Sequence, residues 1–258
     1  MNYCMYINKA YLQFCKNAIT HWNKISKETD TLHVYATDLE SINELGTHFK
    51  EKNINLIYRD NKFVSQDFQD YNTPLFKQLM VDKMLAIKHC LLNFGECLYF
   101  DADVVFFKNI EENIDKSNDI VFAVDCPNHP YLWVCTGFFF LKNNEKVFDL
   151  IDKTIKKQIE GNLVEQEAIN DIMDISWRQI TDKTVNSPGD IRNYKNGGIK
   201  LDVFPLNEIF CGWTINNLNH VYKDSLSKNI VKVIHANHTT GNNSKIQMLK
   251  NMNAWIYE

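Results

Sequence analysis

Residues 97–106 read Cys97-Leu98-Tyr99-Phe100-Asp101-Ala102-Asp103-Val104-Val105-Phe106, in which two acids around an alanine separate two apolar runs. In an extended chain residues i and i+2 point the same way, so Asp101 and Asp103 direct their carboxylates to one point. Two close carboxylates repel each other unless a cation lies between them, and hard oxygen ligands suit Mg²⁺ or Mn²⁺, which also hold nucleotide phosphates. The alternative is a pair of turn residues on a solvated loop, which the apolar flanks disfavour because burying unpaired carboxylates is costly.

Upstream of this segment, short apolar runs alternate with stretches of helical periodicity. The pattern predicts strands at 3–7, 32–36, 54–58 and 97–100, and helices at 11–22, 39–52 and 73–93. Such alternation is typical of βαβ units that build a parallel sheet with helices on both faces. The two acids then follow a strand at its carboxyl end, where open α/β sheets bind ligands.

The second half of the chain is less regular. We expect strands at 120–124, 132–141, 199–204 and 230–234, helices at 145–160, 165–173 and 245–255, and a turn-rich loop at 186–198 that acts as a lid. These strands fit antiparallel additions to a parallel sheet. No Pro/Gly/Ser-rich linker interrupts the pattern, so the sequence predicts a single Rossmann-like α/β domain over residues 1–258, with a mostly parallel central sheet flanked by helices.

Composition excludes several classes of protein. The 258 residues are 45% hydrophobic and 23% charged, which is ordinary for a globular chain, and the formal charge of −4 without a basic block argues against a nucleic-acid partner. No apolar run approaches the ~20 residues of a membrane-spanning helix, and no charged and apolar leader precedes the first strand. Seven cysteines without a CxxC pair indicate reduced thiols. We therefore expect a cytoplasmic protein, in a bacterial or virus-infected cell, that is not secreted by a cleaved signal.

The segment LYFDADVVFFKN at 98–109 resembles the DxD segment of metal-dependent GT-A glycosyltransferases, specifically the glycogenin-like and nucleotide-diphospho-sugar transferase families. Further segments match in the order that these families show. They are Asn8-Lys9-Ala10-Tyr11, Lys83 in the helix before the DxD strand, Cys135-Thr136-Gly137-Phe138-Phe139-Phe140, Glu165-Gln166-Glu167-Ala168-Ile169-Asn170, and Val233-Ile234-His235-Ala236-Asn237-His238 with Gly241 and Lys245. This order across residues 3–255 is more specific than any one motif.

The resemblance assigns a role to each matched segment. It implies a metal site of Asp101, Asp103 and His235 that holds Mn²⁺ or Mg²⁺, because a neutral imidazole can complete a site built on two carboxylates. For the nucleotide and the donor sugar it implies Asn8, Tyr11, Lys83, Asp101, Ala102, Thr136, Gly137, Gly241 and Lys245. The candidates for steadying the reacting sugar or orienting the acceptor are Gln166, Glu165 and Asp125.

Simpler explanations and departures from the family pattern accompany these roles. Lys83 and Lys245 also fit solvent-facing lysines on helices, and Gly137 also fits a β-bulge. Glu165 stands where many relatives have aspartate, and Cys135-Thr136 stands where Asn-Ser or Asn-Thr is commoner. The His235 to Lys245 spacing exceeds that of glycogenin, so the metal ligand is His235, His238 or neither.

The resemblance implies a retaining hexosyl- or pentosyltransferase of glycan biosynthesis, without a transmembrane segment. It would move a sugar from a nucleotide-diphosphate donor, a UDP-sugar, to a hydroxyl of a glycan, glycoprotein or other acceptor through a short-lived ion pair. Two alternatives remain. A nucleotidyltransferase would use the same acids, although the sequence has no GxxxxGK[ST] loop. A catalytically inactive chain would only bind a sugar or nucleotide.

Overall fold

One large sheet organises the molecule. The computed structural model describes residues 1–50, 53–61, 64–125, 133–173, 198–217, 219–239 and 241–257, and the backbone of 194–196. Within these residues, eight strands pair in the order β3-β2-β1-β4-β7-β6-β9-β8. Their bounds are β1 (Asn2–Ile7), β2 (Thr31–Ala36), β3 (Ile54–Tyr58), β4 (Cys97–Phe100), β6 (Ile120–Val124), β7 (Val134–Leu141), β8 (Tyr194–Asn196) and β9 (Ile199–Val203). The predicted α/β fold is confirmed.

The strand directions follow the sequence pattern. The β1–β2, β2–β3, β1–β4 and β6–β9 pairs are parallel, whereas β7 is antiparallel to both β4 and β6, and β8 is antiparallel to β9. Six of the eight strands therefore run the same way, and the antiparallel strands lie in the second half of the chain, as predicted. Strands β4, β6 and β7 are buried throughout, which explains their continuous apolar runs.

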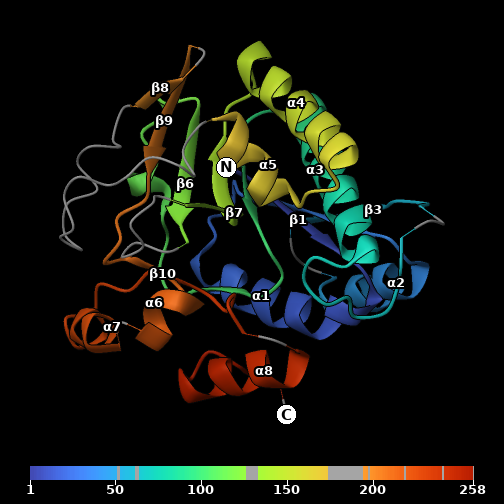
Figure 1. Cartoon of the computed structure of the whole chain (residues 1–258). Coiled ribbons are helices and arrows are strands. Elements are labelled where there is room, and N and C mark those ends of the chain that lie inside the picture. Colours follow the sequence, from blue (N-terminus) through green and yellow to red (C-terminus); the bar gives the residue numbers. More distant parts are fainter. Residues whose placement is uncertain are drawn as a thin grey trace.

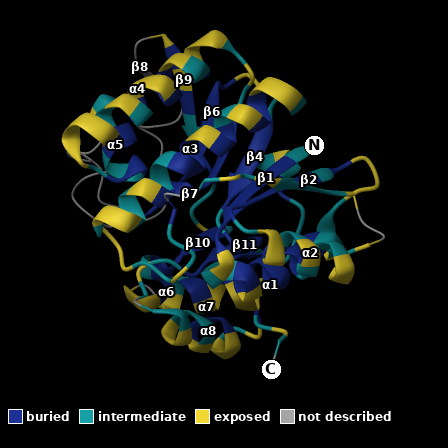
Figure 2. Ribbon diagram, turned by 90° about the vertical axis from the view of Figure 1, so that its right-hand side faces the viewer, coloured by how far each residue is buried: buried dark blue, intermediate teal, exposed yellow. Residues whose placement is uncertain are grey.

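Helices cover both faces of this sheet (Figure 1). One face packs against α1 (Leu12–Ile25) and α2 (Leu39–His48), and the other against α3 (Pro74–Phe94), α4 (Glu145–Gly161) and α5 (Glu165–Ile172). Figure 2 shows the buried strands between helices whose outer sides are exposed. Helix α3 starts where expected, because the Thr73 side chain accepts a hydrogen bond from Phe76 N–H and Pro74 takes the first position; it ends at Gly95, whose φ is 92°.

A second sheet of three strands was not predicted. It pairs β10 (Ile209–Cys211) with β11 (Val233–His235) and β11 with β5 (Val104–Phe106), the strand that directly follows Asp103. The antiparallel register places His235 opposite Val104. The predicted strand at 230–234 is thus displaced toward His235, and the new sheet brings the C-terminal third of the chain to the end of β4.

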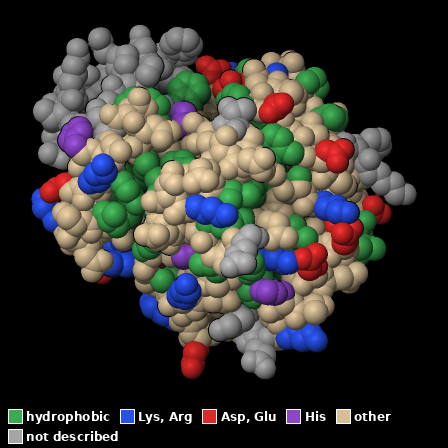
Figure 3. All heavy atoms as spheres, turned by 90° about the horizontal axis from the view of Figure 1, so that it is seen from below, with side chains coloured by type: hydrophobic (Ala, Val, Ile, Leu, Met, Phe, Trp, Pro, Cys, Tyr) green, Lys and Arg blue, Asp and Glu red, His purple; other side chains and the backbone are tan. Residues whose placement is uncertain are grey.

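The remaining helices lie below this second sheet. They are α6 (Gly212–Asn217), α7 (Asn219–Ser227) and α8 (Asn242–Asn251), with short 3₁₀ turns at Lys9–Tyr11 and Glu111–Asn113. Helix α8 begins three residues before the predicted 245 and ends at 251 rather than 255. Figure 3 shows this underside, where charged side chains of both signs are interspersed with hydrophobic ones. None of the described helices combines the length and the apolar character needed to cross a membrane. Most of the predicted lid at 186–198 lies outside the described residues.

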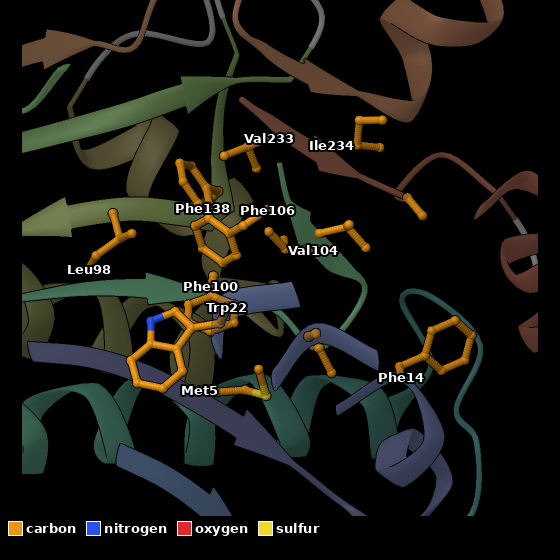
Figure 4. Close-up of a cluster of buried hydrophobic side chains, with 14 of the residues drawn as sticks. Met5, Phe14, Trp22, Leu98, Phe100, Val104, Phe106, Phe138, Val233 and Ile234 are labelled. Atoms are coloured by element: carbon orange, nitrogen blue, oxygen red, sulfur yellow. The ribbon is translucent and has the colours of Figure 1, made fainter. Parts of the chain in front are cut away.

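An aromatic core lies between the two sheets and α1 (Figure 4). Phe106 of β5 meets Phe100 of β4 edge to face, with ring centroids 4.9 Å apart, and Tyr3 meets Trp22 of α1 at 5.5 Å. All four side chains are at most 1% exposed. Because Phe100 and Phe106 flank the two acids in sequence, this core holds the Asp101–Asp103 turn on both sides.

We expect Phe106→Ala to lower the free energy of unfolding by about 3–5 kcal/mol, because it opens a cavity in this core. Chemical denaturation monitored by circular dichroism measures the change. Leu92→Ala on the outer side of α3, where the leucine is 61% exposed, is the matched control and should change stability by less than about 0.5 kcal/mol. Equal effects of the two substitutions would contradict the central place of this core.

Candidate active site

Three side chains converge where β4 ends. Asp101 and Asp103 leave the strand in a tight turn, in which Asp101 N–H donates to the Gly137 carbonyl and Val104 N–H donates to the Asp101 carbonyl. His235, at the end of β11, places Nε2 3.2 Å from Asp103 Oδ1 and 3.8 Å from Asp101 Oδ2. The three ligand atoms all lie within 4.8 Å of one another. Two carboxylates and an imidazole at this spacing fit a divalent cation such as Mn²⁺ or Mg²⁺.

Gly137 of β7 forms the floor of this cluster. A Cβ at this position would lie 2.5 Å from Asp101 Oδ2 and still closer to His235 Cε1. Any side chain would therefore fill the space between the carboxylate and the imidazole. Of the two explanations for this glycine, the structure favours close approach at the site.

Lys83 is buried, not solvent-facing. Its Nζ lies 3.0 Å from Asp101 Oδ1 and 2.9 Å from Glu165 Oε1, and the side chain is almost fully enclosed. Burial alone would lower the pKa of the ammonium, but the carboxylates of Asp101 and Glu165 outweigh it and raise the pKa. The Tyr99 hydroxyl also donates to Asp101 Oδ1, at 2.7 Å. Asp101 Oδ1 is thus contacted by both the Lys83 ammonium and the Tyr99 hydroxyl.

Lys245 neutralises the second acid. Its Nζ lies 2.5 Å from Asp103 Oδ2. Burial would raise the pKa of Asp103, but Lys245 and His235 overcome this and hold the pKa well below its usual range. Likewise burial would lower the pKa of Lys245, and Asp103 raises it. Asp103 therefore stays a carboxylate wherever the protein is folded at ordinary pH.

A second polar network lies beside the cluster. Gln166 Nε2 donates to Asp125 Oδ2 at 2.9 Å, and Thr136 N–H donates to Gln166 Oε1 at 3.2 Å. His238 Nε2 also lies 3.0 Å from Asp125 Oδ2. The geometry thus groups His235 with the two DxD acids and His238 with Asp125, which favours His235 as the metal-ligand candidate.

Asn8, Tyr11 and Gly241 line the cavity beside Lys245. Asn8 follows β1, and its Nδ2 donates to the carbonyls of Ser65 and Asp67, which turns Oδ1 the other way; within the described residues this buried oxygen has no partner. The Tyr11 ring centroid lies 5.9 Å from Lys245 Nζ. Gly241, with φ at 81°, is the N-cap residue of α8 and leaves the first N–H groups of that helix without a side-chain cap.

All of these groups face one cavity of about 780 Å³. Every residue that the sequence proposed for the site lines it: Asn8, Tyr11, Lys83, Asp101, Ala102, Asp103, Asp125, Thr136, Gly137, Glu165, Gln166, His235, Gly241 and Lys245. Sequence reasoning gave no individual site role to the lining residues Phe76, Met80 and Asn237. Phe76, Met80 and Lys83 are spaced i, i+4 and i+7 on α3, so they lie on one face of the helix. This spacing could have indicated that Phe76 and Met80 line the site together with Lys83.

A sequence model of the nucleotide-diphospho-sugar transferase family matches residues 27–249. No curated protein sequence matches the chain. Among solved structures, the fold is similar to the glycosyltransferase GlyE of Streptococcus pneumoniae TIGR4, with a TM-score of 0.61, 11% identity, and coverage of 99% of this chain and 60% of that one.

Two further structures are similar along nearly their whole length. An active-site mutant of LgtC has a TM-score of 0.61 and 10% identity, covering 100% of this chain and 97% of LgtC. A glycosyltransferase involved in glycosylation of the major capsid of PBCV-1 has a TM-score of 0.52 and 12% identity, covering 98% of each chain. By contrast, the chain spans only 60% of GlyE and 51% of the bifunctional WbbM. These comparisons confirm the predicted GT-A fold.

We expect Gly137→Ala to abolish binding of Mn²⁺, because the added methyl group would occupy the space between Asp101 and His235. Titration calorimetry with MnCl₂ measures the loss, and circular dichroism checks that the variant is folded. Gly46→Ala in α2 is the matched control, since its Cβ would meet only Leu56 Cδ1 at an ordinary 3.4 Å. Wild-type Mn²⁺ affinity in Gly137→Ala would place the cation elsewhere.

Proposed function

Since the chain belongs to the nucleotide-diphospho-sugar transferase family, we propose that it transfers a sugar from a UDP-sugar to a hydroxyl acceptor, with a divalent cation and with retention of anomeric configuration. The observation that carries this proposal is the convergence of Asp101, Asp103 and His235 beside Lys245 in one cavity. A cation bound there would supply the positive charge that neutralises the diphosphate of the donor.

The side chains around the cluster fit a diphosphate leaving group. The Lys245 ammonium can stabilise the negative charge that develops on the diphosphate as the glycosidic bond breaks. The uncapped N–H groups at the start of α8, next to Gly241, add a second set of donors for phosphate oxygens. Asp103 has a pKa held well below its usual range, which suits a ligand of a hard cation, and Asp101 Oδ1 lies 3.0 Å from the Lys83 ammonium.

The Asn8 side chain supports a uridine nucleotide. Its amide nitrogen donates to two carbonyls, which leaves the buried oxygen to accept a hydrogen bond from a base. Uracil offers an N–H at ring position 3, whereas cytosine carries no hydrogen there and offers only its exocyclic amino group. Guanine also presents N–H groups, so nucleotide binding must distinguish the two.

The Glu165 and Asp125 carboxylates, which line the cavity, support an ion-pair route to retention. Glu165 is tied to the Lys83 ammonium and to the Thr136 hydroxyl, and Asp125 accepts hydrogen bonds from neighbouring side chains. A carboxylate so engaged is a poor nucleophile. Gln166, which cannot act as a base, can offer its carbonyl oxygen to the positive anomeric carbon or to the acceptor hydroxyl. LgtC has been solved with donor and acceptor sugar analogues, which supports a shared cavity for both substrates.

The first test is titration of UDP, GDP and CMP into the protein with Mn²⁺, repeated in excess EDTA. We expect UDP alone to bind, in a metal-dependent way. Asp103→Asn should weaken UDP binding more than about 100-fold, beyond the ~10–100-fold loss typical of an outer-shell change, and abolish UDP release from UDP-sugars.

Asp152→Asn is the matched control, because Asp152 lies on the surface of α4 and its ion-pair partner among the described residues is Lys88. Undiminished transfer in Asp103→Asn would refute the metal-dependent mechanism. Release of pyrophosphate from a nucleoside triphosphate would indicate nucleotidyl transfer instead, and UDP binding without turnover of any UDP-sugar would indicate a binding module.

A further inference from the structure

The Asp125 carboxylate, which follows β6 at the cavity wall, is fully engaged by protein groups. Oδ2 accepts from Gln166 Nε2 at 2.9 Å and faces His238 Nε2 at 3.0 Å, and Oδ1 accepts from Asn237 Nδ2. The residue is only 4% exposed. Both oxygens therefore face donors of the protein itself, which leaves the carboxylate less available to a substrate proton or an anomeric carbon.

The amide of Gln166 is fixed from both ends by this arrangement. Its nitrogen donates to Asp125, and its oxygen accepts from the backbone N–H of Thr136 at 3.2 Å. If the Gln166 amide were rotated by half a turn, its oxygen would face the Asp125 carboxylate and its NH₂ group would face the Thr136 N–H. Both contacts are repulsive, so only one orientation is allowed. In that orientation Gln166 keeps one N–H and one oxygen lone pair for the cavity.

The backbone behind Asp125 is equally constrained. Gly212 N–H donates to Asn237 Oδ1 at 2.7 Å, which turns the Asn237 amide nitrogen toward Asp125. A Cβ at Gly212 would penetrate the Asn237 carbonyl, so the two segments abut with no room for a side chain. His238 adopts φ 53°, an uncommon conformation for a residue other than glycine, with its imidazole at Asp125. The hydrogen bond to Asp125 raises the pKa of His238.

We propose that Asp125 is a positioning residue, and that with Asn237 it fixes the Gln166 amide so that one donor and one acceptor face the reacting groups. The assignment rests on the proposed function, and it replaces a direct catalytic role for Asp125. It also makes Asn237 and Gly212 part of the site's support, because they orient the groups that hold Asp125. The orientation of Gln166, and not its mere presence, then limits the rate of transfer.

Exchanging the two side chains tests the proposal. In Asp125→Asn, the new side-chain NH₂ group must face another donor, either Gln166 Nε2 or Asn237 Nδ2. In Gln166→Glu, the new carboxylate faces the carboxylate of Asp125. We expect each single variant to lower kcat roughly 5- to 150-fold, as expected from leaving one buried polar group unpaired. The double variant Asp125→Asn, Gln166→Glu restores a donor–acceptor pair and should be at least about tenfold more active than the product of the single losses predicts.

A second readout does not depend on turnover. In ¹⁵N spectra the Gln166 side-chain amide, assigned by its disappearance in Gln166→Glu, should exchange slowly with solvent in the wild type and at least about tenfold faster in Asp125→Asn. Asp152→Asn serves as the surface control for both measurements. Independent losses in the double variant, or an unchanged Gln166 amide in Asp125→Asn, would overturn the proposal. Failure of the wild type to bind UDP with Mn²⁺ would instead refute the proposed function, while the amide exchange still reports on the positioning contact.

Discussion

Two carboxylates at the end of one strand can stay ionised together only if positive charge faces both, and the rest of the site is arranged around that requirement. Asp101 receives Lys83 from α3, Asp103 receives Lys245 from α8, and His235 from β11 lies beside both acids. Lys83 precedes the two acids in the sequence, whereas His235 and Lys245 lie near the end of the chain. Charge compensation at the β4 turn therefore ties the C-terminal third of the protein to the N-terminal parallel sheet.

The parts of the fold that the sequence predicted are those with enough residues to show a period. Strands β1 to β4 show as short apolar runs and helices α1 and α3 carry apolar positions at helical spacing, while Thr73-Pro74 and Gly95 mark the ends of α3. Strands β5, β10 and β11 have three residues each, too few for any alternation to be visible. The pairing of β11 with β5 joins residues more than a hundred positions apart, such as Val233 and Phe106, which local pattern does not encode.

The candidate site was likewise predicted only in part from the sequence. The DxD acids were identified from their spacing and their apolar flanks, and family resemblance added further lining residues, including Lys83. The lysines of α3 by themselves left a solvent-facing Lys83 equally open. Lys83 contacts two carboxylates in the cavity, whereas Lys88 pairs with Asp152 on the surface. The difference lies in which segments pack against each turn of α3. Asn237 lies in a matched segment but received no role of its own, because that role comes from Gly212 and Asp125, which approach it from other segments.

On the proposed function, the Lys245–Asp103 ion pair links donor binding to cation binding. Lys245 has a single acidic partner, Asp103, among the ion pairs of the described residues. A cation held by Asp103 would share its charge, so Lys245 would be attracted to Asp103 less strongly and its ammonium would be available to a diphosphate. The cation and the nucleotide would then each favour the binding of the other, because each would relieve an electrostatic interaction that the other has to break. A Lys245 that faced solvent would lack this coupling, so on the proposed function the buried Lys245–Asp103 pair joins the two binding events.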